Sequence, residues 1–424
     1  MEQEQVRNSS FNGDEVLIVN GGSFGERLKN LIKEKGIKSV ETIRTKDSMK
    51  IKNRLYQAVT HSMATALDRV QYYADYSLRL KCKSKVDWSI LREKIKKKVH
   101  EIEANKTAPE DIYSIEKKGS EIYINGEVCR AKNIVVVNSV ENTEEINLNN
   151  LWIKLVELES TSFCVFLSGG SRQTVETASI LSDLGCKVYL SLKDTVLLPE
   201  CDTNIQENIK NILLEKGVTL FFESSVEIIN ELGRTYTVTV NTSNGFSQVV
   251  KDIDYYFTER EYSLEINTME SQRILSVSEP GKNIGKAEVE VLNNLFPSEF
   301  SKDEKYFPLV PTYIYTSPPA ATVGYTEALA RKNFPSVRVV NPKFRGLFYS
   351  VCQNKVPTDY KLVFALGTAE NPQKERLVGL HLFGASSIDA IKGFSIGMYC
   401  GISPEDILKT IPIHPTSSEE VITG

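Results

Sequence analysis

The chain has 424 residues, of which 41% are hydrophobic and 25% are charged, and its formal net charge is −4. This composition excludes a disordered chain, a collagen-like repeat and a small disulfide-rich scaffold, and the length suffices for about three domains. No apolar run approaches the roughly 20 residues that a membrane helix needs, and the acidic, polar N-terminus lacks a secretory pattern. We therefore expect a cytoplasmic protein with no membrane partner.

Residues 1–13 are polar, and we expect them to form a disordered tail. The apolar run from Glu15 to Val19 then predicts a strand, and a turn containing Asn20, Gly22 and Gly25 leads into a helix. Such a strand, turn and helix open a dinucleotide-binding βαβ unit, whose turn brings backbone N–H groups to a pyrophosphate. Because Asn20 replaces the first glycine of the GxGxxG pattern, we favour a turn that packs but no longer binds.

Residues 88–102 carry apolar side chains at spacings of three and four, which predicts an amphipathic helix. Its other face includes Lys94, Lys96, Lys97 and Lys98, and residues 79–98 hold nine basic and two acidic side chains. A solvated lysine face is the favoured interpretation, and binding to RNA or to an acidic protein surface is the alternative.

A hairpin is predicted over residues 120–129, with an Asn-Gly turn, and a buried strand over residues 134–137. A second βαβ unit follows: a strand over 164–167, a turn with Gly169 and Ser171, and a helix over 175–184. Ser171 replaces the second glycine of the fingerprint, and no acidic residue ends the next strand, over residues 187–190. Two eroded fingerprints predict two nucleotide-binding folds without predicting that either binds a cofactor.

From residue 307 the pattern changes to short strands over 313–315, 337–340, 362–364 and 377–380, followed by helices over 387–400 and 404–409. Within this region, PTYIYTSPPAATVGYTE (311–327) and HPTSSEE (414–420) resemble the dimerisation domain of the glutathione reductase family of pyridine nucleotide–disulfide oxidoreductases. The resemblance extends over nearly the whole chain and is strongest over 306–424.

The resemblance implies an α/β fold with two Rossmann-like nucleotide-binding domains and an α+β dimerisation domain. The expected domains are an FAD-binding-like domain (14–150 and 255–305), an NAD(P)-binding-like domain (151–254) and a dimerisation domain (306–424). It also implies a homodimer, although the dimerisation domain could instead bind another partner.

Several site residues are implied by the same resemblance. His414 and Glu419 match the acid–base pair, Glu176 matches an acid that pairs with a flavin-contacting lysine, and Glu279 falls where an aspartate contacts the sugar-phosphate chain of the flavin. The family's redox cysteines, spaced C-x4-C, fall on residues 43–48, whereas the first cysteine of this chain is Cys82. Thiol–disulfide exchange by the family's route needs a thiolate there.

We therefore predict a degenerate family member: a catalytically inactive pseudoenzyme without bound cofactors, retained to bind a macromolecular partner such as the ribosome or another RNA-containing assembly. FAD is the cofactor we would expect if one is bound. One alternative is a residual FAD- and NAD(P)H-dependent flavoprotein with disulfide-independent, diaphorase-like electron transfer. Another is a nucleotide sensor that signals through the dimer. The four histidines and seven cysteines have no metal-ligand spacing, so no metal site is expected.

Overall fold

The computed structural model describes residues 16–19, 22–34, 40–45, 49–70, 72–77, 87–104, 112–113, 115–118, 121–124, 126–137, 148, 150–230, 235–259, 263–268, 273–278, 284–296, 309, 311–353, 356–366 and 374–423. The chain divides into two compact units. The first unit comprises Met1–Arg54, Glu101–Asn150 and Arg260–Tyr306, and the second comprises Leu55–His100, Leu151–Glu259 and Phe307–Gly424. No described helix is both long and apolar enough to cross a membrane. The expected tail over 1–13 lies outside the described residues.

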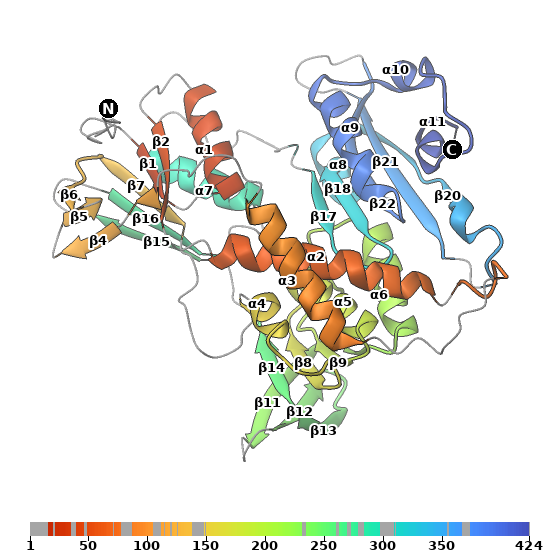
Figure 1. Cartoon of the computed structure of the whole chain (residues 1–424). Coiled ribbons are helices and arrows are strands. Elements are labelled where there is room, and N and C mark those ends of the chain that lie inside the picture. Colours follow the sequence, from red (N-terminus) through yellow and green to blue (C-terminus); the bar gives the residue numbers. More distant parts are fainter. Residues whose placement is uncertain are drawn as a thin grey trace, which may run out of the picture. The chain divides into compact units, whose positions relative to one another are not determined.

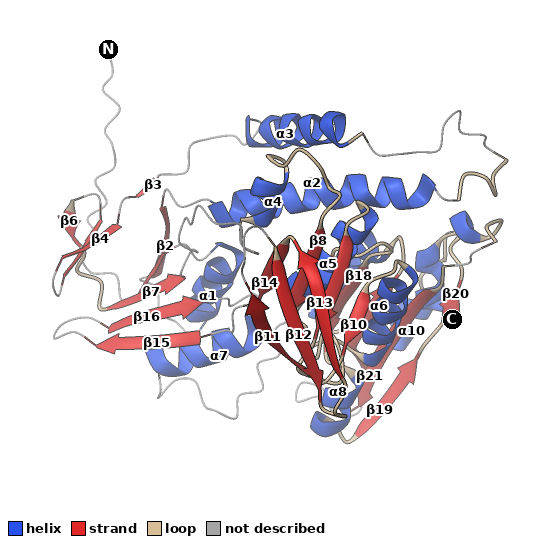
Figure 2. Ribbon diagram, turned by 90° about the horizontal axis from the view of Figure 1, so that it is seen from below, coloured by secondary structure: helices blue, strands red, loops and turns tan. Residues whose placement is uncertain are grey.

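The first unit is built on a six-stranded sheet in the order β15-β16-β7-β1-β2-β3. All its neighbours pair in parallel except β15, which runs antiparallel to β16 (Figure 2). A smaller antiparallel sheet in the order β4-β5-β6 contains the predicted hairpin, in which Gly126 has φ of +84°. The elements of the unit are β1 (Val16–Val19), α1 (Gly22–Glu34), β2 (Val40–Thr45), β3 (Ile112–Tyr113), β4 (Ile115–Lys118), β5 (Glu121–Ile124), β6 (Glu127–Val128), β7 (Asn133–Val137), β15 (Ser263–Thr268), β16 (Arg273–Ser278) and α7 (Ile284–Leu295).

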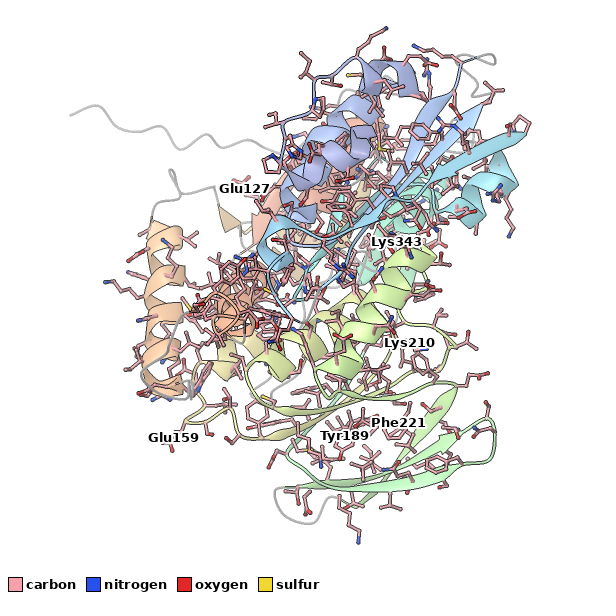
Figure 3. The ribbon with its side chains drawn as sticks, turned by 90° about the vertical axis from the view of Figure 1, so that its right-hand side faces the viewer. Glu127, Glu159, Tyr189, Lys210, Phe221 and Lys343 are labelled. Atoms are coloured by element: carbon pink, nitrogen blue, oxygen red, sulfur yellow. The ribbon has the colours of Figure 1, made fainter. Side chains whose placement is uncertain are left out.

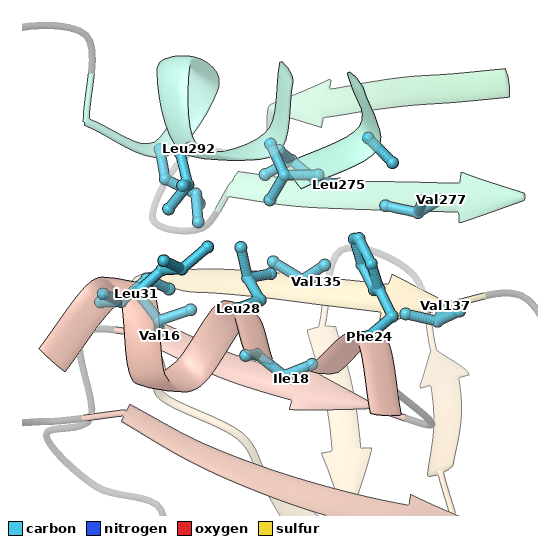
Figure 4. Close-up of a cluster of buried hydrophobic side chains, with 14 of the residues drawn as sticks. Val16, Ile18, Phe24, Leu28, Leu31, Val135, Val137, Leu275, Val277 and Leu292 are labelled. Carbon is cyan, nitrogen blue, oxygen red and sulfur yellow. The ribbon is translucent and has the colours of Figure 1, made fainter. Parts of the chain in front are cut away.

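Helix α1 packs on the large sheet through a stripe at helical spacing. Phe24, Leu28 and Leu31 are buried against β7, β16 and α7, where Leu275 and Leu292 face them (Figure 4). Burying each such side chain contributes about 1.5–3 kcal/mol before entropy costs, so this contact fixes α1 on the sheet. The helix therefore begins directly after β1, as in a dinucleotide-binding unit.

The second unit contains a parallel sheet in the order β10-β9-β8-β14 and an antiparallel sheet in the order β11-β12-β13 (Figure 2). Stacked rings cross the parallel sheet: the ring centroid of Tyr189 lies 6.1 Å from that of Phe166 and 6.4 Å from that of Phe221. Tyr189 and Phe221, on the neighbouring strands β9 and β10, are labelled in Figure 3. Residues 255–258 form β14, so they complete this sheet rather than the sheet of the first unit. The elements are α2 (Met49–Val70, mostly in this unit), α3 (Trp88–Ala104), α4 (Leu151–Leu155), β8 (Cys164–Ser168), α5 (Arg172–Asp183), β9 (Lys187–Ser191), α6 (Thr203–Glu215), β10 (Thr219–Phe221), β11 (Ser224–Asn230), β12 (Tyr236–Thr242), β13 (Ser247–Ile253) and β14 (Tyr255–Thr258).

The C-terminal part of this unit is an antiparallel sheet in the order β17-β18-β22-β21-β19, with β20 paired to β21. Helix α9 packs on β18 and β22 (Figure 1). The mixture of parallel and antiparallel sheets confirms the predicted α/β class. The elements are β17 (Thr312–Ile314), β18 (Ala320–Gly324), α8 (Glu327–Asn333), β19 (Ser336–Val340), β20 (Lys343–Phe344), η2 (Leu347–Tyr349), β21 (Thr358–Leu366), β22 (Arg376–Phe383), α9 (Ser387–Tyr399), α10 (Pro404–Leu408), η3 (Ser417–Glu419) and α11 (Glu420–Thr423).

Candidate nucleotide-binding and acid–base sites

The glycine-rich turn after β8 brings Gly169 and Ser171 to the N-terminus of α5. Gly169 has φ of +132°, a conformation that side chains other than glycine rarely adopt, and its N–H donates to the Ser191 carbonyl over 2.8 Å. Ser171 is the N-cap residue in an extended conformation, so α5 begins at Arg172, three residues earlier than predicted. Among the described residues, the buried Ser171 hydroxyl has no hydrogen-bond partner.

The carboxylate of Glu259 lies against this turn. Glu259 follows β14, and its backbone N–H donates to the Ser168 carbonyl over 2.9 Å. The Ser171 N–H donates to Glu259 Oε2 over 2.9 Å, and a Cβ placed on Gly169 would lie 2.2 Å from Glu259 Cδ. The side chain therefore fills the space over the bare glycine, where helix N–H groups favour an anion. Sequence reasoning missed Glu259 because it is 88 residues from Ser171 along the chain.

Glu176, which the resemblance matches to an acid that pairs with a lysine, has an amide and a backbone N–H among its partners. It is fully buried on α5 and accepts hydrogen bonds from Gln57 Nε2 (2.8 Å) and from the Tyr315 N–H (3.1 Å). Arg172 Nε lies 3.8 Å from Glu176 Oε1 and places a positive charge beside the carboxylate. Gln57 comes from α2, so the carboxylate connects α2, α5 and the segment after β17.

His414 and Glu419 are brought together by the turn that ends in η3. His414 Nδ1 lies 3.0 Å from Glu419 Oε1 and 3.1 Å from Oε2. The imidazole is 82% exposed, whereas the carboxylate is 12% exposed. The carboxylate can therefore orient the ring while the other ring nitrogen, Nε2, stays open to solvent, which is the arrangement of an acid–base pair. Their catalytic role remains a prediction.

In the first unit the described part of the turn fits close packing of helix on strand. A Cβ on Gly25 would lie 3.0 Å from Ile18 Cγ2, so α1 approaches β1 at a distance that only glycine allows without a shift. This is the role of the third glycine in a dinucleotide fingerprint. Gly22 is the first residue of α1, and Asn20 and Glu279 lie outside the described residues.

The lysine face of α3 is partly neutralised. Lys94, Lys97 and Lys98 are exposed, whereas Lys96 Nζ lies 3.3 Å from Glu93 Oε1 and 3.7 Å from Glu157 Oε2. This arrangement is that of a solvated helix with ion pairs.

The two cysteines closest in sequence are buried and weakly acidic. Burial raises the pKa of Cys186 to about 12 and raises that of Cys201 well above its usual value. Both thiols therefore stay protonated near neutral pH and are poor nucleophiles. Among the described residues, no group of three or more His, Cys, Asp or Glu side chains could hold a metal ion.

A buried charged cluster, which the sequence analysis also missed, joins α6 to the C-terminal sheet. Lys361 Nζ lies 2.6 Å from Asp202 Oδ1 and 3.2 Å from Glu327 Oε2. His381 is fully buried beside them, with Nε2 2.9 Å from the Tyr325 carbonyl. Burial lowers the pKa of His381, and the Asp202 charge offsets this only in part. The cluster holds the two parts of the second unit together.

Comparison with known proteins identifies two domains and a set of similar enzymes. Residues 165–245 match the pyridine nucleotide-disulphide oxidoreductase family, and residues 310–423 match its dimerisation domain. The chain is 26% identical to a glutathione reductase of Yarrowia lipolytica over 297 residues, or 63% of this chain and 62% of the relative. It is 25% identical to the Debaryomyces hansenii glutathione reductase over 304 residues, covering 63% and 60%, and 38% identical to the Schizosaccharomyces pombe enzyme over 118 residues, covering 27% and 24%. Residues 165–245 and 310–423 therefore carry two domains of a pyridine nucleotide–disulphide oxidoreductase, and the chain is similar to glutathione reductases.

These matches correct two expectations. The prediction of a catalytically inactive protein is wrong, because the matched family and the named relatives are oxidoreductases. The prediction of no cofactor is wrong as well, because glutathione reductase relatives imply FAD and NAD(P)H. The dimerisation-domain match supports a homodimer, and no comparison supports a ribosomal or RNA partner. The chain spans about three fifths of the length of the first two relatives.

The glycine turn after β8 fits the pyrophosphate of a pyridine dinucleotide in its chemistry. The bare Gly169, the Ser171 N–H and the orphaned Ser171 hydroxyl form a cradle that already holds an anion, with the Glu259 carboxylate standing in for a phosphate. In the first unit, the described residues show only the close packing of α1 on β1 at Gly25, which is the role of the third glycine of a dinucleotide fingerprint.

Proposed function

We propose that the chain is an NAD(P)H- and FAD-dependent oxidoreductase that delivers electrons to an acceptor without using a cysteine pair of its own. The observation that carries this proposal is the family match over 165–245 and 310–423 in a chain whose first cysteine is Cys82. The match supports the cofactors, and the position of Cys82 supports the change of acceptor.

Each nucleotide has residues that would hold it. The turn at Gly169 and Ser171 would bind the pyrophosphate of NAD(P)H. Helix α1, which packs on β1 through Gly25, would direct its N-terminus at the pyrophosphate of FAD. When bound, the nicotinamide supplies a hydride to the flavin, which passes the electrons on. Neither the uptake of two electrons from the nicotinamide nor their release to an acceptor, one or two at a time, would then need a protein thiol.

His414 and Glu419 would serve proton transfer to the reduced acceptor. Glu419 accepts a hydrogen bond from His414 Nδ1, so the imidazole keeps a fixed orientation. Its Nε2 can then donate or accept a proton at the solvent-exposed face. This role survives the loss of the cysteine pair when the acceptor, such as a quinone, takes up protons together with electrons.

The test compares acceptors with the FAD-reconstituted chain. We expect NADPH or NADH oxidation to be supported by ferricyanide and a soluble quinone, and not by glutathione disulfide. A Cys82→Ser variant should behave like the parent. Turnover of glutathione disulfide at a rate similar to that of the quinone would refute the proposed acceptor. Failure to oxidise either nicotinamide with any acceptor would refute the oxidoreductase proposal as a whole.

A further inference from the structure

We propose that Glu259 is an internal competitor for the pyrophosphate site after β8, so that a pyridine dinucleotide binds only when this carboxylate leaves the cradle. The inference rests on the proposed function for the identity of the dinucleotide. It adds that this chain regulates its own nicotinamide site through one side chain.

The competition follows from the geometry of the turn. Glu259 Cγ and Cδ would both lie 2.2 Å from a Cβ on Gly169, so the side chain lies directly against the backbone that a phosphate would approach. Its Oε2 takes the Ser171 N–H, which is one of the donors at the start of α5. A pyrophosphate oxygen and the Glu259 carboxylate oxygen cannot both occupy the position that accepts the hydrogen bond from the Ser171 N–H.

Glu259 is held at the site by its backbone. Thr258 pairs with Ser168 across β14 and β8, and the Glu259 N–H continues the ladder to the Ser168 carbonyl over 2.9 Å. The main chain therefore stays beside the turn, and only the side chain has to rotate away. A carboxylate left near the cradle also repels an incoming phosphate.

The competition lowers the apparent affinity for the dinucleotide. When the competent state is only a fraction of the population, the apparent dissociation constant rises by the inverse of that fraction. A charge-assisted hydrogen bond to a carboxylate keeps the occupied state dominant. Removing the carboxylate should therefore tighten binding at least about tenfold, or ~1.4 kcal/mol.

The experiment measures binding by calorimetry, with NADPH, NADH and inorganic pyrophosphate as separate titrants and no electron acceptor. We expect Glu259→Ala and Glu259→Gln to bind both dinucleotides and pyrophosphate more tightly than the parent. Glu207→Gln, which removes an exposed carboxylate from α6, should leave all three affinities unchanged. Adenosine, which has no phosphate, should bind the parent and both Glu259 variants equally.

A second measurement guards against a folding defect. Without ligand, Glu259→Ala should melt at a lower temperature, because the Ser171 N–H loses its acceptor, and saturating NADPH should raise its melting temperature more than that of the parent. Unchanged or weaker binding of NADPH and pyrophosphate by folded Glu259→Gln would overturn the inference, as would an equal gain in Glu207→Gln. Tighter binding without any flavin reduction would support the inference while refuting the proposed function.

Discussion

Lys361→Met removes a buried ammonium group from between two carboxylates. Its Nζ lies 2.6 Å from Asp202 Oδ1 and 3.2 Å from Glu327 Oε2, and the side chain is 7% exposed. Burial lowers the pKa of Lys361, but the hydrogen bonds and charges of Asp202 and Glu327 outweigh it and raise that pKa overall. The lysine is therefore charged at neutral pH, and its loss leaves the Asp202 charge buried without its closest counter-charge.

The expected loss is large because one member of a buried ion pair is left behind. Such a loss costs about 3–5 kcal/mol, whereas a surface pair contributes about 0–1 kcal/mol. Lys343→Met is the matched control: Lys343 Nζ lies 3.2 Å from Asp359 Oδ2, and both Asp359 and Asp202 are 2% exposed, but the Lys343 side chain is 64% exposed (Figure 3). Asp359 also accepts from Asn208 Nδ2 at 3.0 Å and from Asn341 Nδ2 at 2.7 Å.

The assay is urea unfolding followed by tryptophan fluorescence. The chain has two tryptophans, Trp88 and Trp152, and both are buried in the second unit, so the signal reports the unit that contains the cluster. We expect Lys361→Met to shift the midpoint far more than Lys343→Met, and Asp202→Asn to recover part of the loss in the double variant. Equal, small shifts for both lysine variants would refute the argument that burial makes this pair costly to break.

Three further predictions concern the acid–base pair, pH and assembly. His414→Gln should leave NADPH–ferricyanide activity within about twofold, because ferricyanide takes up no proton, and should slow quinone reduction; a large, equal loss with both acceptors would contradict the assigned role. Because burial holds the pKa of His381 below its ordinary value of 6.5, the neutral form is favoured in the folded state, and stability should fall as pH decreases below about 6.5. His381→Gln should flatten that decline in urea midpoints measured from pH 7.5 to 5, and an unchanged slope would assign the decline to other groups. Ile411 and Ile413 are 88% and 75% exposed, so replacing both with aspartate should convert a homodimer into a monomer by light scattering, and a dimer that persists would exclude this patch from the interface.

The elements that sequence patterns predict well are those with strong local signals. α3 has an apolar stripe from Trp88 to Val99, and the hairpin has an Asn-Gly turn whose glycine carries a positive φ. The C-terminal strands and the turn that joins His414 to Glu419 follow from motifs that resemble a known family. In each case the residues that fix the structure lie close together in the sequence.

The elements that escaped prediction depend on contacts between distant residues. Helix α2 has 22 residues, yet its buried positions include the polar residues Gln57, Thr60 and His61. Because these residues are polar, the sequence shows no apolar stripe at helical spacing there. Gln57 and His61 bond to partners far along the chain, Glu176 and the Thr316 carbonyl. Glu259 reaches the turn at Gly169 only because β14 pairs with β8. The inactive, cofactor-free interpretation is contradicted by the matches to oxidoreductases, because substitutions in a glycine motif do not by themselves decide whether the turn binds a nucleotide.

If this chain takes electrons from NAD(P)H onto a flavin, an anaerobic titration will show the transfer. The FAD-reconstituted protein is titrated with NADPH, and separately with NADH, while the visible absorbance of the flavin is recorded. We expect a flavin band at near-stoichiometric occupancy that one of the nicotinamides bleaches at about one equivalent per flavin, because hydride transfer carries two electrons. A protein that retains no added FAD, or a flavin band that neither nicotinamide bleaches, would contradict it.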